Sequence, residues 1–277
     1  MPSKFTNLLL PPKKYRYAIT SLVLSAGFVF IQLLNGVSRF PAIFLLMIFT
    51  GLLSAWSFIE GLGKNMTWIS LILPLLFTLS VGLFWFLLPS SVFTRIPIVM
   101  FFAVGIYVLI STMNIYTVSS TLRNIALLRA ARGVGFVLTL VTSFFVFDAI
   151  LSIKQSPLVS SGLILVSSFL MFLQGFWSIT LEKNFNKEVF MLSLISAFVI
   201  TQISTILFFW PVTVVVGSLF LTSGVYLLLG LGQAKLEERL FSAIVKEYLT
   251  VGLIVLIGMF FATRWGKLGE ERASDTL

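Results

Sequence analysis

Nine apolar runs, each long enough to cross a lipid bilayer, recur along the 277 residues of this chain. The hydrocarbon core is about 30 Å thick and needs roughly 18 or more apolar residues per helix. Because lipid offers a bare backbone no hydrogen-bond partner, such runs have to be helical. The sequence therefore predicts an all-α membrane protein, a polytopic bundle of about nine transmembrane helices. We place the spans at about 17–37, 41–61, 67–88, 96–117, 133–153, 158–180, 188–209, 212–231 and 248–265.

Composition agrees with this interpretation. Hydrophobic residues make up 58% of the chain and charged residues 10%, whereas soluble domains carry about 25% charged residues. Such a chain cannot cover itself with a polar surface, so lipid is its solvent. The first apolar run is full length and follows Lys13, Lys14 and Arg16, which indicates a retained span rather than a cleaved signal.

The positive charges predict the orientation. With the N-terminus in the cytoplasm, thirteen of the 19 basic residues lie on the cytoplasmic side, as the positive-inside rule requires. The tryptophans also fall near predicted span ends, as an aromatic belt does; they are Trp56, Trp68, Trp85, Trp177, Trp210 and Trp265. We expect a multi-pass protein of the cell membrane, cytoplasmic or plasma, with a cytoplasmic N-terminus and, because the span count is odd, an external C-terminus.

Landmarks that recur in one order predict an internal repeat. Trp56-Ser57 matches Trp177-Ser178, and Gly105 matches Gly224. Four spans per copy would make the two copies parallel. Chance similarity between apolar runs is the alternative, and it stays open. The predicted organisation is a cytoplasmic tail at 1–16, a first repeat with a basic cytoplasmic segment at 17–132, a second repeat at 133–247, a ninth span at 248–266 and a tail at 267–277.

Each predicted repeat ends in an unusual cytoplasmic segment. In the second, Glu238, Arg239, Ser242 and Lys246 share one side of a helical wheel, which predicts an amphipathic helix on the inner leaflet. The first, Val118 to Arg132, is less regular and fits either an interfacial helix or an extension of the fourth span. Within the third span, Pro74 predicts a kink, which would be a packing feature or a gating hinge.

Only one of the ten acidic residues, Asp148, lies clearly inside an apolar run. A carboxylate there fits a proton- or cation-coupling site, or an interfacial group that reaches water, Lys154 or Arg39. Proton relays usually string several acidic or histidine groups across the membrane. A single carboxylate therefore supports coupled transport only weakly.

Two further groups are candidate binding residues. Arg123, Arg129 and Arg132 lie at the predicted cytoplasmic border, where we expect them to hold lipid phosphates by charge-assisted hydrogen bonds. Voltage sensing is the alternative, but only Arg129 and Arg132 keep the required three-residue spacing. Gln174 and Gln202 lie in consecutive spans, where they would line a polar pocket or join helices by hydrogen bonds.

Several chemistries are excluded or unsupported. The chain has no cysteine and no histidine, which removes disulfides, thiolate sites and the commonest metal ligand. No phosphate-binding loop, dinucleotide fingerprint or paired-carboxylate site stands out. We expect no cofactor, no metal and no catalytic residue. The net charge of +9 is explained by membrane topology, so the expected partners are membrane lipids and other membrane-protein subunits, not nucleic acid.

These observations favour a non-enzymatic assembly or lipid-organising subunit. The 29 phenylalanines and the scarcity of buried charge suit broad contact with lipids or other spans. The alternative is a small transporter or channel for a neutral or lipid-like solute, built on the parallel repeats. An intramembrane enzyme is the least supported function, because serines, tyrosines and one aspartate would have to supply all its groups.

Overall fold

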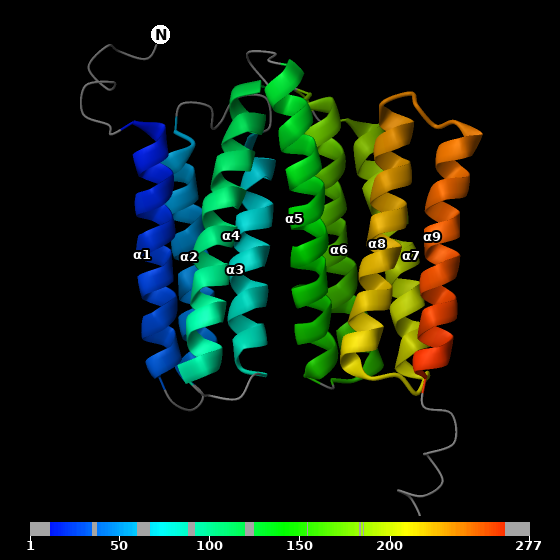
Figure 1. The fold of residues 1–277 in the computed structure, drawn as a ribbon, viewed down its shortest axis with the longest axis horizontal. Helices are drawn as coiled ribbons and strands as arrows, with labels where there is room; N and C mark the ends of the chain where they lie inside the picture. Colours follow the sequence, from blue (N-terminus) through cyan, green and yellow to red (C-terminus); the bar gives the residue numbers. More distant parts are fainter. Residues whose placement is uncertain are drawn as a thin grey trace, which may run out of the picture. The chain divides into compact units, whose positions relative to one another are not determined.

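The computed structural model describes residues 12–34, 38–59, 67–87, 92–119, 125–153, 155–182, 184 and 186–263. Over these residues it contains nine helices long and apolar enough to cross a membrane (Figure 1). The predicted all-α polytopic bundle is thereby confirmed. The helices are α1 (Lys13–Leu33), α2 (Arg39–Ser57), α3 (Ile72–Trp85, preceded by the 3-10 turn Thr67–Leu71), α4 (Val92–Ser119), α5 (Ile125–Ser152), α6 (Pro157–Thr180), α7 (Lys187–Phe208), α8 (Val214–Leu236) and α9 (Ser242–Ala262).

The helices group into two compact units. Unit 1 contains Met1–Leu138 and Leu181–Phe185, and unit 2 contains Thr139–Thr180 and Asn186–Leu277. The division falls within α5, close to the boundary at 132/133 that the sequence pattern predicts between two repeats. The repeat itself stays a prediction.

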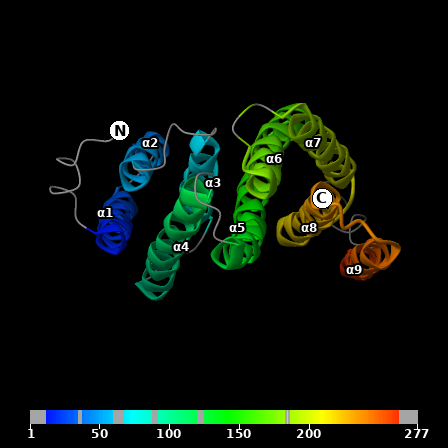
Figure 2. The same cartoon turned by 90° about the horizontal axis from the view of Figure 1, so that it is seen from above.

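In unit 1, α1 packs against α2 and α4, and α3 packs against the same two helices (Figure 2). Three fully buried phenylalanines hold the centre together, one from each of α1, α3 and α4. The ring centroid of Phe102 lies 4.8 Å from that of Phe28 and 6.0 Å from that of Phe77. Buried aromatic pairs at such distances add attraction beyond the area they bury, so these rings fix how the helices of unit 1 meet.

In unit 2, α6, α7 and α8 pack against one another, while α9 packs chiefly against α8. Figure 2 shows α9 at the edge of this group. The two helices approach closely at Gly252, where an added Cβ would lie 2.6 Å from Leu227 Cδ1. The rings of Tyr226 and Tyr248 lie 5.1 Å apart near the start of α9. Met259 is the one buried residue of α9, so most of this helix faces outward.

Two predicted cytoplasmic segments differ from the structure. Residues 125–132, which we expected in an interfacial helix or an extension of the fourth span, instead form the first two turns of α5. The amphipathic interfacial helix expected at the end of the second repeat is replaced by a turn between α8 and α9. Glu238 adopts a left-handed backbone there, with φ of 58°, which ends the helix. The polar residues Ser242 and Lys246 then fall on the first turns of α9.

Pro74 and Pro97 both lie inside helices. Pro74 is the third residue of α3, directly after the 3-10 turn Thr67–Leu71, and thus lies inside the span Thr67–Trp85. A proline has no N–H to donate to the preceding turn. At this position the helix changes from 3-10 to α geometry. Pro97, expected to open the fourth span, lies inside α4, which begins earlier, at Val92.

Candidate functional site

Asp148 is buried in α5 of unit 2, where its side chain is 3% exposed. The Ser218 hydroxyl of α8 lies 3.3 Å from its Oδ1 and is placed to donate to it. The same hydroxyl also lies 2.9 Å from the Val215 carbonyl oxygen of its own helix. The structure therefore places the carboxylate in a contact between two helices. The interfacial interpretation had expected it to reach water or a basic side chain. Within the described residues, no lysine or arginine forms an ion pair with it.

Arg39, one of the two basic residues considered as a partner of Asp148, binds within unit 1. Its Nε donates to the Leu34 carbonyl oxygen at 2.6 Å, and its guanidinium lies 5.6 Å from the centroid of the Phe86 ring. Lys154, the other, lies outside the described residues.

Gln174 and Gln202 do not share a pocket. Gln174 is buried in α6, with 1% exposure, whereas Gln202 is exposed on α7. A third glutamine, Gln233 of α8, lies near Gln174. Its Nε2 donates to the carbonyl oxygen of Gly175, the residue after Gln174, at 3.1 Å. The polar contact at this end of unit 2 thus links α6 to α8. The role of both predicted residues in binding stays a prediction.

The three arginines expected to hold lipid phosphates are only partly described. Arg129 is exposed and Arg132 half-buried on the first turns of α5, while Arg123 lies outside the described residues. Within unit 2, Lys235 Nζ lies 3.8 Å from Glu188 Oε1. That pair is exposed, and such pairs stabilise a fold by little.

Arg16 is a polar core residue that the sequence interpretation missed. We assigned it to the cytoplasmic border for its charge, yet its side chain is 1% exposed on the first turn of α1. One turn later, the Thr20 hydroxyl lies 3.0 Å from the Ser57 hydroxyl of α2. The signal was present in the spacing, because residues 16, 20, 24 and 28 follow one face of a helix and all of them are buried.

Several other buried hydroxyls of unit 1 also join helices. Ser21 donates to the Ala103 carbonyl oxygen of α4 at 2.6 Å. The Thr50 hydroxyl lies 3.0 Å from that of Thr78 on α3, and Tyr116 of α4 donates to the Ala131 carbonyl oxygen of α5 at 2.8 Å. These side chains act as contacts between helices and do not line a common chamber.

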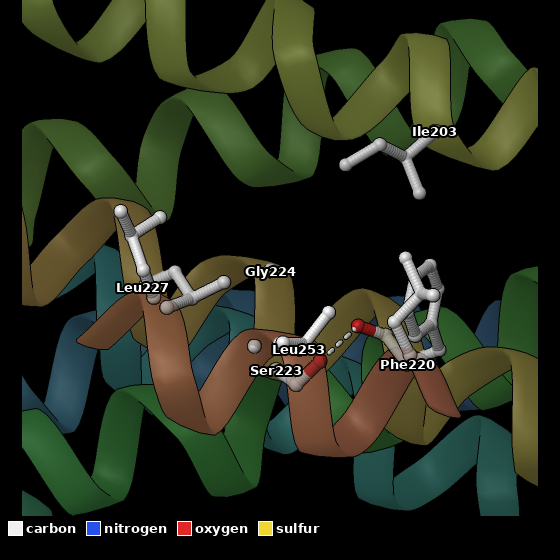
Figure 3. Close-up of a pocket in the computed structure, with 9 residues that line it drawn as sticks. Ile203, Phe220, Ser223, Gly224, Leu227 and Leu253 are labelled. Carbon is white, nitrogen blue, oxygen red and sulfur yellow. Dashed lines mark hydrogen bonds between the residues drawn. The ribbon is translucent and has the colours of Figure 1, made fainter. Parts of the chain in front are cut away.

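A cleft of about 330 Å³ opens between α7, α8 and α9 (Figure 3). Its walls are apolar, with Ile203, Leu227 and Leu253 among them. The one hydroxyl in its lining, that of Ser223, donates to the Phe220 carbonyl oxygen of its own helix at 2.7 Å. The cleft therefore presents a hydrocarbon surface with no reactive or charged group.

No cluster in the described part of the chain resembles a metal or catalytic centre. Groups of three or more acidic residues that could hold a metal ion are absent there. Asp148 is the one buried acid of the described spans, and the Ser218 hydroxyl lies beside it.

Comparisons with known proteins give one match. A family model described as "Protein of unknown function (DUF5656)" matches residues 59–262, which is most of the chain and includes α3 to α9. No curated protein and no solved structure matches the chain.

Proposed function

We propose that this chain, which belongs to the family of proteins of unknown function DUF5656, is a non-enzymatic membrane subunit that assembles with other spans or organises lipids. In this proposal it lies in the cell membrane with its N-terminus in the cytoplasm. Its partners are membrane lipids and other membrane-protein subunits.

The observation that carries the proposal is the exposure of α9. This helix has 21 residues, of which only Met259 is buried. The apolar side chains of Ile254, Ile257 and Phe261 are exposed and lie outside the lining of the cleft. A helix held chiefly by one neighbour offers nearly its whole circumference to lipid or to a partner span. Such a surface suits contact better than it suits chemistry.

The buried polar groups support the same function. Thr20, Thr50 and Asp148 each meet a hydroxyl of another helix. Hydrogen bonds of this kind hold helices together in lipid. A solute pathway would instead need polar groups that converge on one cavity, and the described cleft is lined by apolar side chains.

The basic residues at the starts of two helices support a contact with lipid headgroups. Arg129 is exposed near the start of α5, and Lys246 is exposed near the start of α9. In the proposed topology both helices begin on the cytoplasmic side. The anionic lipids of the inner leaflet attract basic side chains by about 1 kcal/mol each.

Native mass spectrometry of the full chain, extracted with its own lipids, tests the proposal. We expect the chain at a fixed stoichiometry with another protein, with further copies or with bound lipid. A chain that carries a defined small solute, and that moves this solute across reconstituted vesicles, would contradict the assembly function.

The cleft between α7, α8 and α9 favours a second candidate, a transporter or channel for a neutral or lipid-like solute. Its size falls within the range of small-molecule sites, and its walls would accept an apolar molecule. Ser223→Phe would fill it. Under this second function the variant stops the transfer of a fluorescent lipid between vesicle leaflets, whereas under the assembly function wild type and variant both leave this lipid in place.

A further inference from the structure

Gln202 is an exposed amide in the second half of the apolar helix α7. It lies on α7 six residues before the last residue, Phe208, or about 9 Å along the axis at 1.5 Å per residue. Among the amide side chains of the described helices it is the only exposed one, since Gln32, Asn114, Gln174 and Gln233 are buried or half-buried.

The amide of Gln202 has no hydrogen-bond partner within the described structure. The neighbouring Thr201 and Thr205 hydroxyls form hydrogen bonds within the helix, because each donates to the carbonyl oxygen four residues earlier. A glutamine is too long to do this efficiently and carries two donors and an acceptor. Leaving these groups in hydrocarbon is costly, so a partner from outside the chain is expected.

The surroundings of Gln202 fit another helix. Five exposed residues of α7 follow steps of four and three along the helix: Met191, Ile195, Phe198, Gln202 and Thr205. This is the spacing by which two helices pack at a shallow left-handed crossing. The opposite face, with Ser193, Ala197 and Ile200, is buried within unit 2. A single polar residue in such a seam sets the register of the two helices.

The adjoining helix leaves room for that approach. The Ser161 hydroxyl of α6 lies 2.9 Å from the Thr205 hydroxyl, which ties α6 to α7 beside the seam. Gly162, the next residue, is exposed and has open space where a Cβ would be. Small residues at such positions let a neighbouring backbone come close.

We infer that the occupant of this seam is a second copy of this chain, packed through α7 about a two-fold axis with Gln202 opposite Gln202. An amide is its own complement, because each copy offers an N–H donor and a carbonyl acceptor to the other. A two-fold interface requires this self-complementarity. A lipid tail cannot satisfy the amide. The inference goes beyond the assembly function, since a transporter could form the same dimer.

Disulfide trapping in native membranes tests the dimer. The chain has no cysteine, so Phe198→Cys, one turn from Gln202 on the same seam, provides a single reporter. On oxidation we expect a band of twice the chain mass, because residues that meet across a two-fold axis bring their Cβ atoms within disulfide range. Phe44→Cys, exposed on α2 in unit 1, is the matched control and should stay monomeric.

Gln202→Leu and Gln202→Asn then separate the amide from the apolar seam. Gln202→Leu should weaken the dimer roughly 3- to 20-fold, the range expected for hydrogen bonds between helices in lipid, while Gln202→Asn keeps part of the dimer. Gln202 is exposed, so neither change should lower the unfolding temperature of the monomer. A Phe198→Cys dimer of equal yield with Gln202→Leu, the absence of a dimer, or a band with a different protein would each overturn the inference.

Discussion

Units 1 and 2 join their helices with different polar groups. In unit 1, hydroxyls pair between helices, in Thr20–Ser57 and Thr50–Thr78, and the core of the unit also buries Arg16 and Gln32. Unit 2 adds a carboxylate at Asp148, an amide at Gln233 and an indole at Trp210, whose Nε1 donates to Thr263 Oγ1 at 2.9 Å.

Hydroxyls differ from amides and carboxylates in how their hydrogen bonds can be satisfied in lipid. A hydroxyl can fall back on a carbonyl oxygen of its own helix, as Thr50 does with Leu46 at 2.9 Å, so its loss or exposure costs little. Amides and carboxylates lack that option and need a partner on another helix. In unit 2, Asp148 and Gln233 meet this need on another helix, whereas the exposed Gln202 of α7 has no partner among the described residues.

The largest expected effect comes from the two glycines that the sequence pairs, Gly105 and Gly224. A Cβ on Gly105 would press on the ring of Phe77, which is fully buried, so Gly105→Ala should lower the free energy of unfolding by about 1–3 kcal/mol. Gly224 lines the cleft, and a Cβ there would meet Ile200 Cδ1 at 2.9 Å, the far end of a flexible side chain that is itself buried. Gly224→Ala should therefore change the unfolding free energy by less than about 0.5 kcal/mol, the residual clash being offset by the higher helix propensity of alanine.

Unfolding of both variants in lipid-like detergent, followed by circular dichroism, measures this contrast. Equal destabilisation of the two variants would contradict this contrast. It would mean that the side chains around Gly224 cannot move to accept a Cβ, and that the packing around the two glycines is equally close.

The next effect concerns the attachment of α9. Trp210→Phe removes the hydrogen bond to Thr263 and should cost about 1 kcal/mol. Hydrogen exchange should rise in α9 and stay unchanged in unit 1, because the bond ties only the last turn of this helix. Thr263→Val removes the same bond, so the double variant should be no less stable than the worse single one. If hydrogen exchange in α9 did not rise relative to the rest of the chain, contacts other than the Trp210–Thr263 hydrogen bond would hold this helix.

The hydroxyl pairs of unit 1 should give a smaller effect. In a double-mutant cycle of Thr50→Val and Thr78→Val, we expect a coupling free energy of about 0.6 kcal/mol, the average for such bonds in a membrane. Thr20→Val with Thr78→Val is the control, since neither hydroxyl binds the other, and its coupling should be near zero. A coupling above about 1.7 kcal/mol would place the hydroxyl pairs of unit 1 on a par with the stronger groups of unit 2.

The smallest expected effect is that of Asp148→Asn. The amide has nearly the same size and still accepts from the Ser218 hydroxyl, so stability should change by less than about 0.5 kcal/mol. We expect unchanged assembly in native mass spectrometry. Loss of a cellular function with normal folding would instead identify the carboxylate as a coupling site for a proton or cation.

Much of the fold could be predicted because lipid imposes a simple rule on length and polarity. All nine spans were located, and their ends mostly shift by a few residues. The largest shifts occur where polar residues continue a helix past the hydrocarbon, as Arg129 does on α5. Hydropathy cannot distinguish such an extension from a separate interfacial helix, since both contain basic and apolar residues.

The site residues were harder to predict, because burial depends on which face meets a neighbour. Asp148 and Gln174 proved buried, whereas Gln202 proved exposed, and periodicity alone does not say which side of α7 is covered. Arg16 shows the opposite error. Its charge argued for the surface, although its four-residue spacing from Thr20 already placed it on the buried face of α1.

Labelling of single cysteines in intact cells tests most directly that the helices cross the membrane in the proposed orientation. Asn65→Cys lies between the second and third spans and Ser156→Cys between α5 and α6. A maleimide that cannot cross the membrane should label only Ser156→Cys in intact cells and both variants after permeabilisation. Labelling of Asn65→Cys from outside, or of both variants in intact cells, would contradict the account.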